Sequence, residues 1–123
     1  MSSDAPQLIE TAVHRFLEDV PALKPLKMVI GVDLVGRGDT QMFRLEMPDV
    51  KVTKDIAADA RVRVSMRRDF FNLMVEHEAR VADWHQAFYE GRAKATGVAQ
   101  YLKLIAQVVE KQEERNRLKR SRH

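Results

Sequence analysis

Residues 60–74 read ARVRVSMRRDFFNLM. In the first half of this stretch apolar residues alternate with polar ones, and in the second half apolar residues recur every three or four positions. The first pattern is typical of a β-strand with one wet face, and the second is typical of an amphipathic helix. The stretch therefore predicts a strand over residues 60–66 that runs directly into a helix over residues 67–77.

The residues before this stretch predict a helix followed by a hairpin. Apolar residues with a 3.6-residue period indicate a helix that begins at Asp4 as N-cap and ends at Pro21. The period then changes to two, and the turn residues 36–39 divide the alternating segment into an antiparallel hairpin. The strands predicted here are residues 26–34, 41–47 and 50–54.

The residues after this stretch predict a short helix, a strand and a long final helix. The short helix covers residues 81–90 and ends at Gly91, a residue type that favours the C′ position. A strand over residues 92–96 leads into a helix over residues 98–116. The apolar stripe of this helix stops after Val109, so we expect its first three turns to pack on the domain and its end to project into water.

The order of these elements predicts an α+β fold with a five-stranded, mostly antiparallel sheet covered by helices and a long C-terminal helix. We expect residues 1–109 to form one domain and residues 110–123 to form a charged, basic helical extension. The extension holds six basic and three acidic residues, whereas the first 109 residues hold equal numbers of each. The basic character of the chain therefore belongs to the extension and not to the domain.

Composition limits the class of protein. The chain has 123 residues, of which 45% are hydrophobic, which is enough for one domain with a buried core. It has no cysteine, which excludes disulfides, thiolate metal sites and cysteine nucleophiles, and makes the cytoplasm the expected location. No apolar run approaches the roughly 20 residues that a membrane-spanning helix needs.

Residues for catalysis or metal binding are scarce. None of the histidines has the i, i+4 partner of a helical zinc site. Ser65 lacks the glycines of a nucleophile elbow, and neither Gly36 nor Gly38 leads into a helix as a phosphate-binding loop would. We therefore predict no metal, no cofactor and no catalytic residues.

Basic residues outside the extension do not predict nucleic-acid binding. Arg61 and Arg63 alternate along the predicted strand, but no aromatic residue shares their face for base stacking. We predict a solvated sheet face and no nucleic-acid partner. The basic extension predicts weak contact with an anionic membrane, at about 1 kcal/mol per basic residue near the surface.

Large apolar residues are concentrated in the C-terminal half. They fit either a packed core or the wall of a cavity for an apolar ligand, and composition leaves both open.

Two blocks of the sequence resemble the sterol carrier protein 2 (SCP2) family. Residues 60–74 are similar to the strand and apolar helix of that family. Residues 87–97, AFYEGRAKATG, are similar to its pattern aromatic–x–x–Gly–basic–x–basic–x–x–Gly, which is the more specific of the two. The resemblance covers about residues 10–109 and implies a five-stranded sheet covered by helices.

The resemblance also implies an apolar tunnel between sheet and helices that holds a fatty acid, a fatty acyl-CoA or a sterol. We therefore expect non-enzymatic binding or transfer of such a lipid. The alternative is a ligand-free accessory domain that supports a lipid- or steroid-metabolising enzyme, and the oligomeric state stays open. An enzyme would need a polar group in the tunnel, for which Tyr101 and His85 are the candidates. The tunnel residues that the resemblance implies are Phe70, Leu73, Met74, Phe88, Tyr101, Leu102 and Ile105, and Trp84, between the two blocks, is a further candidate.

Overall fold

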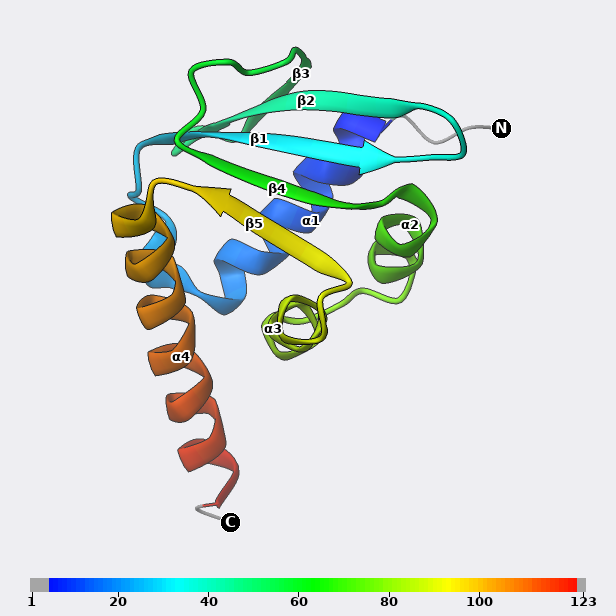
Figure 1. Cartoon of the computed structure of the whole chain (residues 1–123). Coiled ribbons are helices and arrows are strands. Elements are labelled where there is room, and N and C mark those ends of the chain that lie inside the picture. Colours follow the sequence, from blue (N-terminus) through cyan, green and yellow to red (C-terminus); the bar gives the residue numbers. More distant parts are fainter. Residues whose placement is uncertain (1–4, 122–123) are drawn as a thin grey trace.

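The computed structural model describes residues 5–121, which form a five-stranded sheet with helices on one side of it (Figure 1). The predicted α+β fold and its long C-terminal helix are confirmed. The predicted N-cap, Asp4, lies outside the described residues. The elements are α1 (Ala5–Asp19), the 3-10 helix η1 (Pro21–Leu23), β1 (Met28–Val35), β2 (Thr40–Met47), β3 (Lys51–Lys54), β4 (Val62–Arg67), α2 (Arg68–Glu76), α3 (Val81–Glu90), β5 (Ala93–Gly97) and α4 (Ala99–Ser121).

The strands lie in the order β3-β2-β1-β4-β5. The pairs β1–β2, β2–β3 and β4–β5 are antiparallel, whereas the central pair β1–β4 is parallel. Two parallel strands that lie side by side cannot be joined by a hairpin and need a crossover connection. Residues 55–61, which lead into β4, cross on the side of the sheet that faces away from the helices (Figure 1). The sheet is therefore mixed but mostly antiparallel, as predicted.

The hairpin of β1 and β2 shows how the period of two directs side chains. Phe43, Leu45 and Met47 of β2 are buried, while the intervening Arg44 and Glu46 are only half-buried. Successive strand residues point to opposite faces, so the three apolar residues join the core beneath the helices. Phe43 is fully buried.

The opposite face of the sheet carries an ion pair instead of a solvated surface. The guanidinium of Arg63 on β4 donates from Nη1 to Oδ1 of the buried Asp33 on β1 at 2.6 Å, and from Nη2 to the carbonyl of Ala57 at 3.1 Å. It lies over Gly31, where a Cβ atom would come within 2.8 Å of the guanidinium carbon. The crossover is thus tied to the sheet, and the prediction of a solvated face was wrong at Arg63.

The final helix is longer than predicted. It continues without interruption from Ala99 to Ser121, past Val109, where its apolar stripe ends. Side chains of residues 110–119 are exposed or half-buried, and Figure 1 shows this end projecting away from the sheet. None of the helices in residues 5–121 is long and apolar enough to cross a membrane.

Candidate functional site

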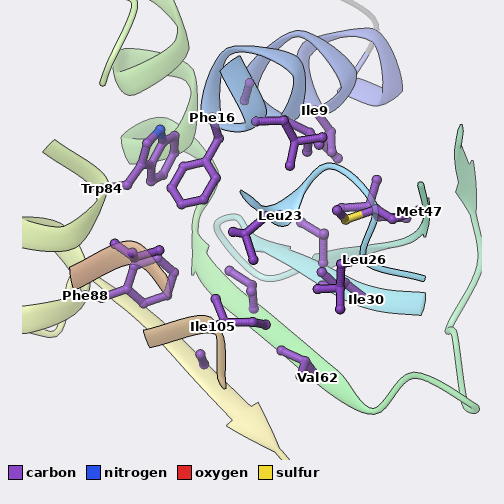
Figure 2. Close-up of a pocket in the computed structure, with 18 of the residues that line it drawn as sticks. Ile9, Phe16, Leu23, Leu26, Ile30, Met47, Val62, Trp84, Phe88 and Ile105 are labelled. Atoms are coloured by element: carbon purple, nitrogen blue, oxygen red, sulfur yellow. The ribbon is translucent and has the colours of Figure 1, made fainter. Parts of the chain in front are cut away.

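An apolar cavity of about 430 Å³ lies between the sheet and the helices. Among the described residues that line it, only His85 is polar. Figure 2 shows side chains from α1, η1, the sheet, α3 and α4 converging on the same space. The residues labelled there are Ile9, Phe16, Leu23, Leu26, Ile30, Met47, Val62, Trp84, Phe88 and Ile105.

Small side chains keep this space open. Three enclosing elements contribute alanines to the lining, namely Ala12 of α1, Ala95 of β5 and Ala106 of α4. Each offers only a methyl group and so takes up little of the space. Protein interiors are otherwise packed with few voids larger than a water molecule, so a hollow of this volume is a specific feature of the fold.

The cavity reaches the surface between α3, β5 and α4. His85, Ala95 and Ala106 line the cavity and are also solvent-exposed, whereas Ile9 and Trp84 on its wall are buried. The opening is therefore bordered by these three elements. An elongated ligand would enter here with its apolar end first.

An ion pair holds the helices α1 and α3 together beside the cavity. Asp19, at the end of α1, has a side chain that is 11% exposed. Its carboxylate accepts hydrogen bonds from Arg80 Nε at 2.8 Å, from Arg80 Nη2 at 2.6 Å and from the backbone N–H of Val81 at 3.1 Å. Hydrogen bonding from Arg80 lowers the pKa of Asp19 below 3.8. The pair positions the start of α3, which carries Trp84.

Replacing Asp19 with asparagine is expected to lower the free energy of unfolding by about 1–2 kcal/mol at pH 7, because a charge-assisted bond is lost beside an exposed arginine. The folded pKa of Asp19 is depressed, so its stabilisation is present above pH 3.8 and is lost as the pH falls through the lower folded value. We therefore compare the unchanged protein with the Asp19→Asn variant by urea unfolding. The difference between their free energies of unfolding should be present at pH 7 and should shrink towards pH 2. The lowered pKa values of Asp59 and Asp69 act in both proteins and cancel. A difference independent of pH would contradict this account.

The structure brings four of the eight predicted tunnel residues to the cavity wall. Trp84 and Phe88 line it from α3, and Leu102 and Ile105 line it from α4. Their contact with a ligand stays a prediction.

The other four predicted residues lie outside the cavity lining. Leu73 is 51% exposed, and Met74 packs against the core elsewhere. The ring of Phe70 lies 5.8 Å from Cζ of Arg92, and the ring of Tyr101 lies 5.8 Å from Cζ of Arg61. The cavity lining thus lacks these four residues, and a role for them in ligand binding stays a prediction.

The face of α2 that packs inward explains why three of these residues, Phe70, Leu73 and Met74, do not line the cavity. The helix buries Phe71 and Val75, which are four residues apart and share one face, and Phe71 lines the cavity. The family resemblance implied instead Phe70, Leu73 and Met74, which lie on the neighbouring face of the helix. Two adjacent phenylalanines satisfy the helical period equally well, so the period alone does not distinguish the stripes.

The N-terminal half of the wall was not predicted as part of the site. Ile9, Phe16 and Leu17 line the cavity from α1, and Leu23 and Leu26 line it from the segment that follows. The apolar period of this helix was visible in the sequence, but it indicated only a buried face. Nothing in the period shows that the buried face borders a hollow.

Groups for chemistry are sparse around the cavity. His85 stands at its opening, and Tyr101, the second candidate of the sequence analysis, is not part of the lining. Within residues 5–121 no three histidine, aspartate or glutamate side chains come together as ligands of a metal ion would. The arrangement offers an apolar volume with one imidazole at its rim.

Solved structures show which fold this is. The chain matches the crystal structure of sterol carrier protein 2 like 2 from Aedes aegypti with a TM-score of 0.54 and 19% identity, over 87% of this chain and 98% of that chain. It matches the solution structure of palmitated SCP2L2 from Aedes aegypti with a TM-score of 0.55 and 19% identity, over 82% of this chain and 93% of that chain. It matches the solution structure of the sterol carrier protein domain 2 of Helicoverpa armigera with a TM-score of 0.54 and 14% identity, over 91% of this chain and 94% of that chain.

The chain therefore has the fold of the sterol carrier protein 2 domain, which confirms the architecture that the sequence resemblance implied. No protein-family model matches the chain, and no curated protein matches its sequence.

Proposed function

We propose that this protein binds a lipid chain in the apolar cavity and does not catalyse a reaction on it. The cavity itself carries the proposal. Its volume of about 430 Å³ falls within the range of ligand sites, roughly 300–1,000 Å³. Its apolar wall is unfavourable in contact with water, so occupation by an apolar ligand would be favourable.

The lining supports a long apolar ligand. Since the described residues around the cavity include no polar side chain except His85 at the opening, a polar ligand would lose its hydrogen bonds inside. A 16-carbon chain gains roughly 12 kcal/mol on burial, at about 0.8 kcal/mol per CH₂. Association and ordering cost roughly 4–15 kcal/mol, which leaves room for micromolar affinity. SCP2L2 from Aedes aegypti, of the same fold, has been solved in a palmitated form, which supports this ligand class.

The proposal extends to the kind of lipid and its use. Fatty acids and other single-chain lipids suit the cavity, with fatty acyl-CoA and sterols as the alternatives, and the bound lipid would be carried or transferred. A ligand-free accessory domain that supports a lipid- or steroid-metabolising enzyme is the alternative function. The cytoplasmic location and the weak contact of the basic extension with anionic membranes stay predictions.

The position of Trp84 provides a direct test. It is the single tryptophan of the chain and lies on the cavity wall. An 18-carbon lipid with two bromine atoms in the middle of its chain should quench the fluorescence of Trp84 on contact, as the acid or as the alcohol. We expect saturable quenching with a micromolar dissociation constant, reversed by the unbrominated lipid. Absence of saturable quenching with both lipids would reject lipid binding in this cavity.

A further inference from the structure

A side-chain contact joins α3 to α4 at the opening of the apolar cavity. Nδ1 of His85 on α3 meets Oε1 of Glu113 on α4, and the contact is an ion pair when the imidazole is protonated. His85 also lines the apolar cavity. Both side chains line a second hollow of about 400 Å³, together with Glu110 and Arg117. The contact therefore stands where the apolar space meets the surface.

Apolar packing contributes little at the level of this contact. Val109 is the last core residue of α4, and Glu113 lies one helical turn beyond it. Side chains of residues 110–119 are exposed or half-buried. Separation of α4 from α3 at Glu113 therefore uncovers little apolar surface and costs little hydrophobic free energy. The polar contact is left to hold the two helices together here.

The strength of the contact depends on a proton. Oε1 of Glu113 is shielded from water, and a shielded carboxylate oxygen without a donor costs free energy. A protonated imidazole supplies a donor and an opposite charge, whereas a neutral imidazole supplies no charge. Histidine is the side-chain type whose charge ordinarily changes between pH 5 and 8. The other charged groups beside His85 are Glu110, which favours the proton, and Arg117, which opposes it, and β5 contributes only the uncharged Ala95 to the opening.

We propose that the contact between His85 and Glu113 is a pH-sensitive gate of the lipid cavity. The protonated imidazole holds α3 against α4 and closes the opening. Loss of the proton weakens the contact, so a lipid enters and leaves faster at higher pH. This inference rests on the proposed lipid binding. It concerns the rate of exchange, and it applies to fatty acids and to other single-chain lipids alike.

The pH dependence of lipid exchange tests the gate. The brominated alcohol is the probe, because it has no titratable group, and recovery of Trp84 fluorescence after mixing with excess unbrominated alcohol gives the rate. We expect the rate to rise about fivefold from pH 5.5 to pH 8, the upper end for a partly exposed ion pair. His85→Gln never carries a charge, so its exchange should be fast and equal at both pH values. His14→Gln, at an exposed position of α1, should keep the pH dependence.

The outcomes of this measurement are distinct. Equal exchange rates at the two pH values in the unchanged protein overturn the gate, as does a pH dependence that persists in His85→Gln. A probe that never quenches Trp84 rejects lipid binding itself, which is a different result.

A variant of Glu113 separates a gate from a binding contact. Glu113 is not part of the lining of the apolar cavity. Glu113→Gln should therefore speed exchange about fivefold at pH 5.5 and change the dissociation constant by less than about twofold. Glu114→Gln removes a charge from the neighbouring exposed position and should exchange like the unchanged protein. An unchanged rate in Glu113→Gln overturns the gate, as does a dissociation constant that weakens as much as the rate rises.

The absence of cysteine from the chain allows a direct test. In the double variant His85→Cys with Glu113→Cys, a short reagent that bridges two thiols through disulfides should join α3 to α4. We expect the bridge to slow exchange at least about tenfold at pH 8, and a reductant to restore the rate. Gln107→Cys with Lys111→Cys is bridged within α4 at two exposed positions and should exchange like the unbridged protein. A bridge between α3 and α4 that leaves the rate unchanged overturns the gate.

Discussion

Replacing Ala106 with phenylalanine is expected to weaken lipid binding by at least about tenfold and to leave the fold as stable as before. Ala106 lines the cavity at its opening, where α4 meets the solvent. A phenyl ring at this position occupies volume that the ligand needs. Because the space is empty, the added ring fills a void instead of forcing packed side chains apart.

The measurement combines quenching of Trp84 by the brominated lipid with urea unfolding. The matched control is Gln107→Phe, which adds the same ring to the neighbouring exposed position outside the cavity and should bind lipid like the unchanged protein. Ala12→Phe fills the cavity from α1 and provides a second, independent variant. If both cavity variants are stably folded and bind lipid with unchanged affinity, the cavity is not the binding site.

Replacing Gly97 with alanine is expected to lower the free energy of unfolding by about 3 kcal/mol or more, from backbone strain and steric overlap together. Gly97 has a φ of +134°, a conformation that residues with a Cβ atom rarely adopt. A Cβ atom here would overlap the carbonyl oxygen of Arg61 and lie 2.9 Å from Cα of Val62. That carbonyl accepts a hydrogen bond from the N–H of Val98 at 2.9 Å, so it is held in place.

The variant Gly91→Ala separates the effect of backbone strain from the effect of steric overlap. Gly91 ends α3 in the left-handed region with a φ of +82°, but no atom lies within 4 Å of the position that its Cβ would take. Alanine there should cost only about 1–2 kcal/mol, from strain alone. Urea unfolding of both variants gives the comparison. Equal losses at the two positions would show that steric overlap at Gly97 contributes nothing.

The elements of the fold could be predicted from the sequence because their periods are local. The alternation in β2 and the 3.6-residue period in α3 are complete within eight and ten residues. The parallel pairing of β1 with β4 could not be predicted, since alternation shows which face is buried and not which strand lies alongside. The same limit applies to α2, where the tertiary contacts of Phe71 decide between two equivalent stripes.

The candidate site was predicted only in part, because four of the eight residues expected in the tunnel reach the cavity wall. Trp84, Phe88, Leu102 and Ile105 lie within or next to the resembling blocks and reach the cavity wall. The cavity itself could not be predicted, because an apolar composition does not distinguish a cavity wall from a filled core. A second hollow, lined by His85 of α3 and by Glu110, Glu113 and Arg117 of α4, was also missed. The sequence placed Glu110 and Glu113 in a solvated extension. Only the tertiary packing of α3 brings His85 beside them, and no local pattern in the sequence shows that packing.

The continuous helix α4 has a mechanical consequence. It contains no proline or glycine between Ala99 and Ser121, the usual causes of a kink. Its last twelve residues extend roughly 18 Å beyond Val109, at about 1.5 Å per residue. The helix therefore has no built-in hinge, and a tilt near Leu102 would displace its distal end by a larger distance. The direction of its charged end is therefore set by how its first turns pack against the rest of the domain.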